Sequence, residues 1–86
     1  MGSLEILYYG RLRDEIGRDR ELVEPPSHVL TVEDLLAWLR GRGEPHASAF
    51  AAGAAIGAAV AGEWAGSGDS LFGAVEVALF PPVGVT

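Results

Sequence analysis

The end of the chain constrains the fold most strongly. An alternating apolar pattern over residues 75–79 runs into Phe80 and then into the double proline Pro81-Pro82. Neither proline nitrogen can donate a hydrogen bond to a neighbouring strand, and each proline keeps the residue before it extended. We therefore expect the last strand to end at Phe80 and residues 81–86 to leave the domain as a stiff, exposed tail.

Composition limits the chemistry that the rest of the chain can perform. The 86 residues suffice for one small domain with a single core. The sequence has no cysteine and no lysine, which excludes disulfides, thiolate metal sites and Schiff-base lysines. The formal net charge is −6, and the arginines near the N-terminus are interleaved with carboxylates. We therefore expect a solvated mixed-charge face and no nucleic-acid partner.

No targeting or membrane segment is predicted. Met1-Gly2-Ser3 passes directly into a strand-like run, which is not a secretory signal. The longest apolar stretch, residues 47–61, is rich in small side chains and shorter than the ~20 residues that a membrane helix needs. We expect a cytoplasmic protein that does not contact a membrane.

The clearest predicted element is a helix from about Val32 to Arg42. Thr31 is a natural N-cap, and Asp34 follows it three residues later in a variant of the capping box. The apolar residues recur at helical spacing, which gives the helix one face for a core. That face consists of Val32, Leu35, Leu36 and Leu39.

The other elements are shorter. The apolar pattern predicts strands at 4–9, 20–24, 63–65 and 74–80 and a short helix at 11–17. Residues 46–62 are ambiguous, and we divide them into a helical turn at 46–52 and a strand at 55–61. This order predicts an α+β fold, with one main helix packed on one face of a mixed sheet. The first and last strands should lie side by side in its middle, since both are apolar on two faces.

The folded body offers no catalytic or metal-ligating constellation. His28 and His46 are far apart in the sequence, have no ligands at metal spacing, and are expected on the surface. No serine lies in a nucleophile motif, and no glycine pattern follows a strand and opens a helix. We expect Trp38 and Trp64 to be buried or partly buried in the core. We therefore predict no catalytic residue, no metal and no cofactor.

Residues 76–83, EVALFPPV, resemble the C-terminal signature of the molybdopterin synthase small subunits (molybdopterin converting factor subunit 1). These are sulfur carriers of the ThiS/MoaD-like kind. Three further segments resemble the same family in the same order. They are YYGRLRDEIG at 8–17, LTVEDLL at 30–36 and AVAGEW at 59–64.

The resemblance implies a β-grasp, ubiquitin-like fold, with residues 1–80 as a single domain and 81–86 as the extended tail. It implies a non-catalytic carrier subunit in molybdenum cofactor biosynthesis. An ATP-dependent adenylating and sulfurylating enzyme would convert the C-terminus to a thiocarboxylate, and the large subunit of molybdopterin synthase would receive it. The implied partner-binding residues are those of the tail. They are Phe80, Pro81, Pro82, Val83, Gly84, Val85 and Thr86.

The tip of the tail departs from the family pattern. Family members end in Gly-Gly, whereas this sequence reads Gly84-Val85-Thr86. Val85 and Thr86 are β-branched and stiff, and they would crowd both a narrow channel and the activated carbonyl. Two other functions therefore stay open. One is a binding module that docks the synthase large subunit by its tail but cannot be thiocarboxylated, and the other is the related carrier role in thiamine or tRNA thiolation.

Overall fold

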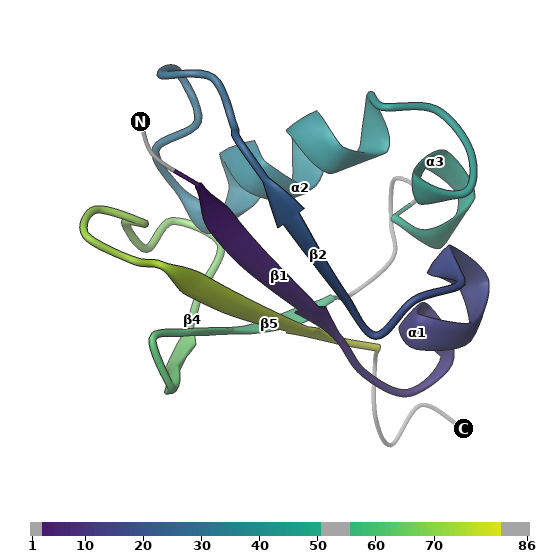
Figure 1. The fold of residues 1–86 in the computed structure, drawn as a ribbon. Coiled ribbons are helices and arrows are strands. Elements are labelled where there is room, and N and C mark those ends of the chain that lie inside the picture. Colours follow the sequence, from purple (N-terminus) through teal and green to yellow (C-terminus); the bar gives the residue numbers. More distant parts are fainter. Residues whose placement is uncertain (1–2, 51–55, 82–86) are drawn as a thin grey trace.

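A five-stranded mixed sheet forms the centre of the part of the chain that the computed structural model describes, residues 3–50 and 56–81 (Figure 1). The strand order is β2-β1-β5-β3-β4. The strands are β1 (Leu4–Tyr8), β2 (Arg20–Val23), β3 (Gly57–Val60), β4 (Glu63–Ala65) and β5 (Glu76–Phe80). The helices are α1 (Arg11–Ile16), α2 (Val32–Arg40) and α3 (His46–Ala49).

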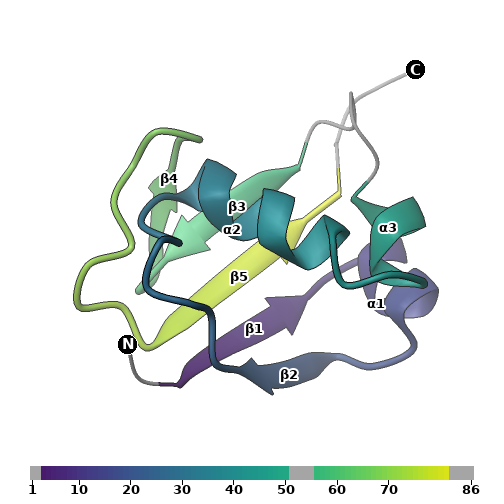
Figure 2. The ribbon, with the colours of Figure 1, turned by 90° about the horizontal axis from the view of Figure 1, so that it is seen from above.

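The first and last strands lie side by side, as the sequence predicts. β1 pairs with β5 in parallel and with β2 antiparallel, and β3 joins β5 to the edge strand β4. Because β1 and β5 are parallel, their C-terminal ends lie at the same end of the sheet. In Figure 2 that is the end at which α1 and α3 lie. The predicted α+β architecture, with the main helix on one face of a mixed sheet, is confirmed.

Several element boundaries differ from the prediction. Helix α2 ends at Arg40 rather than Arg42, with Gly41 at its C-cap. The last strand begins at Glu76 rather than residue 74, because Gly73 has a φ of 78° and the Ala74 N–H donates back to the Leu71 carbonyl in a turn. The predicted helical turn is α3 and the predicted strand after it is β3, but residues 51–55 between them lie outside the described part of the chain.

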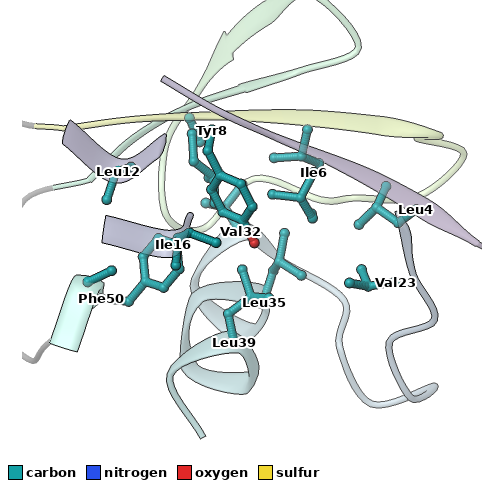
Figure 3. Packing of buried hydrophobic residues seen from close by; sticks show 14 of the residues in the cluster. Leu4, Ile6, Tyr8, Leu12, Ile16, Val23, Val32, Leu35, Leu39 and Phe50 are labelled. Atoms are coloured by element: carbon teal, nitrogen blue, oxygen red, sulfur yellow. The ribbon is translucent and has the colours of Figure 1, made fainter. Parts of the chain in front are cut away.

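The core lies between α2 and the sheet face that it covers. Ile6 and Tyr8 point from β1 towards Val32 and Leu35 of α2 in Figure 3, and all four are at most 2% exposed. Leu12 and Ile16 of α1 join the same cluster, together with Phe50 after α3. The three helices therefore share one core, and within residues 3–50 and 56–81 no helix lies on the opposite face of the sheet.

The capping box of α2 forms as predicted. The Asp34 N–H donates to Thr31 Oγ1 at 3.2 Å, and the Thr31 N–H donates to Asp34 Oδ2 at 3.2 Å. A third donor, the Leu30 N–H, reaches the same carboxylate oxygen at 3.1 Å. Hydrogen bonds from Leu30 and Thr31 hold the pKa of Asp34 below its usual value. The carboxylate thus satisfies backbone donors that the first turn would otherwise leave open.

Removing the cap should destabilise the domain measurably. We expect Thr31→Ala to lower the free energy of unfolding by about 1 kcal/mol, because the Asp34 N–H then loses its acceptor. Thr31→Ser keeps the hydroxyl and serves as the control, and it should stay close to wild type. Urea denaturation of the three proteins measures the difference. If Thr31→Ala and Thr31→Ser lower the free energy of unfolding equally, the hydroxyl of the cap is not the cause of the loss.

Candidate functional site at the root of the tail

Strand β5 ends at Phe80, where the double proline predicts that it ends. Phe80 is the last residue of the ladder and pairs with Gly57 of β3. Pro81 is half-buried directly after it. The remaining predicted tail residues lie outside the described part of the chain. They are Pro82, Val83, Gly84, Val85 and Thr86.

Two aromatic side chains pack against Phe80. The Tyr9 ring is stacked on it, with centroids 4.8 Å apart and planes at 11°. The Trp64 ring lies 5.1 Å from it, tilted by 45°. These three residues come from the end of β1, from β4 and from β5, and we call them the tail-root cluster.

The tail-root cluster lies on the sheet face that has no helix. Successive side chains of a strand point to opposite faces. Since Tyr8 and Leu79 are in the core, their neighbours Tyr9 and Phe80 face the other way. Trp64 is 76% exposed and Tyr9 is 44% exposed. The prediction that Trp64 lies in the core is wrong, because β4 is a three-residue edge strand that turns this side chain to the open face.

The tail-root cluster lies beside Gly57 of the neighbouring strand β3. A Cβ at Gly57 would lie 3.7 Å from Phe80 Cβ and 3.8 Å from Trp64 Cζ3, which is ordinary van der Waals contact. A small side chain at residue 57 would therefore fit beside Phe80 and Trp64. The open face also carries Leu22, which is 69% exposed on β2. Exposed aromatic and aliphatic groups next to a chain exit are typical of a protein-binding surface.

Two hollows on the described surface have charged side chains in their linings. One, of about 170 Å³, lies beside the tail-root cluster between the end of β1 and the start of β2. It is lined by Leu7, Tyr8, Tyr9, Arg13, Asp19 and Arg20. Within residues 3–50 and 56–81, no three histidine or carboxylate side chains gather as metal ligands. The tail-root cluster therefore offers another molecule an apolar surface next to the end of β5.

His46 does not lie free on the surface, contrary to the prediction from sequence. Its Nε2 is 3.0 Å from Glu21 Oε1, which also accepts a hydrogen bond from the Tyr8 hydroxyl at 2.9 Å. Arg42 Nη1 donates to the other carboxylate oxygen at 3.0 Å. The four residues form a polar cluster, which we call the Glu21 cluster. It joins β1, β2 and the segment around α3, and it lies on the core side of the sheet.

No helix in the described part of the chain is long and apolar enough to cross a bilayer.

Among curated proteins, no sequence match to this chain is found. The model of the ThiS family matches residues 6–84. The chain belongs to the ThiS family. The match includes Phe80 to Gly84, and it stops before Val85 and Thr86.

Solved structures resemble this ThiS-family chain over nearly its whole length. The putative molybdopterin converting factor, subunit 1 from Pyrococcus furiosus is 24% identical, with a TM-score of 0.73 and coverage of 96% of this chain and 100% of that one. SAMP1 from Haloferax volcanii is 26% identical, with a TM-score of 0.71 and coverage of 99% and 100%. These likenesses confirm the predicted β-grasp, ubiquitin-like fold. The family match supports a sulfur-carrier role.

Proposed function

We propose that this chain is the sulfur-carrier small subunit of a molybdopterin synthase and delivers sulfur from a C-terminal thiocarboxylate. The observation that carries the proposal is the course of β5. It runs through the middle of the sheet to Phe80 and Pro81, beside the exposed rings of Tyr9 and Trp64. Membership of the ThiS family supports the same function. So does the fold shared with a putative molybdopterin converting factor, subunit 1.

The carrier itself contributes position rather than catalysis. An adenylating partner would join the C-terminal carboxylate to the α-phosphate of ATP and release pyrophosphate. A sulfur nucleophile would then attack the carbonyl carbon, AMP would leave, and a thiocarboxylate would remain. The large synthase subunit would bind the tail-root cluster and receive the tail. Binding at the root makes the reaction of the tip effectively intramolecular, which is the advantage of a rigid carrier.

An intact-mass measurement tests the proposal. The chain is incubated with ATP, a sulfur donor and the adenylating enzyme of a molybdenum cofactor pathway. We expect a mass gain that matches the replacement of one oxygen by sulfur. Val85→Gly/Thr86→Gly should react faster, because it removes two β-branched side chains from the carbonyl that is activated. Absence of exchange in both proteins would contradict the carrier function.

The alternative is a binding module that docks the large subunit by its tail without carrying sulfur. The exposed tail-root cluster supports this alternative as well, because it can bind a partner whether or not the chain carries sulfur. This alternative predicts tight association of the unmodified chain with the large subunit and no exchange. If exchange appears only in Val85→Gly/Thr86→Gly, the tip alone prevents the carrier chemistry.

A further inference from the structure

Gly10 follows Tyr9 after the end of β1 and is the N-cap residue of α1, beside the tail-root cluster. The parallel pairing of β1 and β5 ends with the Tyr9 N–H donating to the Leu79 carbonyl at 3.1 Å. Gly10 then takes a φ of 58° and a ψ of −138°, a combination that residues with a side chain rarely adopt. Helix α1 begins at the next residue. The chain therefore needs a glycine here to turn from the strand into the helix.

A second constraint on Gly10 comes from the tail root itself. A Cβ at this position would lie 2.8 Å from Cγ and 3.2 Å from Cδ of Pro81. Carbon atoms in favourable contact are about 3.5–4.0 Å apart, so the two groups cannot share this space. Four other described glycines also have a positive φ, but a Cβ there would meet no atom within 4 Å. They are Gly17, Gly43, Gly62 and Gly73.

Two neighbouring pairs thus hold the tail root against the end of β1. Tyr9 stacks on Phe80, and the bare backbone of Gly10 faces the ring of Pro81. We propose that Gly10 is a positioning residue, whose missing side chain sets where Pro81 lies at the end of β5. This inference rests on the proposed function only for its partner-binding readout. Its structural readout is independent of any partner.

The consequence of a side chain at residue 10 follows from this packing. The Pro81 ring is closed on its own backbone nitrogen, so Cγ and Cδ can move only slightly unless the backbone moves with them. A methyl group at residue 10 must therefore push Pro81 outward or move the end of β1. Either movement disturbs the stacking of Tyr9 on Phe80 and changes the angle at which the tail meets a binding pocket.

A double-mutant cycle tests the inference. The proteins are wild type, Gly10→Ala, Pro81→Ala and the double variant, and Pro81→Ala removes the two atoms that the new Cβ would strike. Gly17→Ala is the control for a side chain placed at a positive φ, because Gly17 lies at the other end of α1 with a φ of 89° and open space around it. Aromatic proton shifts report the Tyr9–Phe80 stack, and titration with the large synthase subunit reports association.

We expect Gly10→Ala to shift the ring protons of Phe80 and to weaken association about tenfold, while Gly17→Ala leaves both close to wild type. In the Pro81→Ala background the additional effect of Gly10→Ala should be much smaller. Equal effects in both backgrounds would overturn the proposal and assign the cost to backbone strain alone. Should Gly10→Ala fail to fold, folding of the double variant supports the contact, and failure of both overturns it.

The two proposals can fail separately. If the wild-type chain does not bind the large subunit, the proposed function fails, and the cycle is judged on the ring-proton shifts. If the wild-type chain binds but the shifts and affinities of Gly10→Ala match those of Gly17→Ala, only the role of Gly10 is refuted.

Discussion

Glu21→Ala should lower the free energy of unfolding by about 3 kcal/mol, which is more than the loss expected for Thr31→Ala. The Glu21 side chain is 9% exposed and accepts hydrogen bonds from Tyr8, Arg42 and His46. Its removal leaves a nearly buried hydroxyl, a guanidinium and an imidazole without their shared acceptor. Denaturation by urea measures the loss.

Glu24→Ala is the control for this prediction, because Glu24 is exposed directly after β2 and no ion pair is found for it among the described residues. It should unfold almost as wild type does. A loss in Glu21→Ala no larger than in Glu24→Ala would show that the Glu21 cluster contributes nothing to stability.

The same cluster predicts how stability depends on pH. Burial alone would raise the pKa of Glu21, but the hydrogen bonds from His46, Tyr8 and Arg42 outweigh it and hold the pKa below its ordinary value of 4.5. The unfolded chain therefore binds this proton more readily than the folded one. The stability from ionised Glu21 is complete above pH 4.5 and is lost as the pH falls through the lower, folded-state pKa. Wild type and Glu21→Gln should thus converge in stability in acid.

The Glu21 cluster also shows why sequence reasoning reached only part of this structure. The charges of residues 11–21 predict a solvated surface. In the structure Glu21 and Val23 face the core side, while Leu22 is exposed. The hydrogen-bond donors to Glu21 are Tyr8, Arg42 and His46, which are distant from it in the sequence. No local sequence pattern therefore predicts these contacts.

Elements that depend on local chemistry were predictable. The capping box and apolar stripe of α2 involve residues within one or two turns of each other, and the end of β5 follows from the missing N–H groups of two prolines. The tail-root cluster was not predictable in full, because it requires the strand order. Only the adjacency of β1, β5, β3 and β4 brings Tyr9, Phe80 and Trp64 together on a face that no helix covers.

That uncovered face gives Phe80 the largest expected role in partner binding. Phe80→Ala should weaken association with the large synthase subunit by about thirtyfold or more. The Phe80 ring is already held between Tyr9 and Trp64 in the free protein, so it loses little conformational freedom on binding. Its truncation removes apolar contact area and the packing that aligns both neighbours. Calorimetric titration of the carrier into the large subunit measures the change.

Phe72→Ala separates this effect from a general loss of exposed aromatic surface. Phe72 is 94% exposed in the segment between β4 and β5, outside the tail-root cluster. Because it has few contacts to lose, its truncation should leave both stability and association near wild type. If the two phenylalanine variants bind equally well, the partner does not use the tail root. If Phe72→Ala is the weaker binder, the partner contacts the segment between β4 and β5 instead of the tail-root cluster.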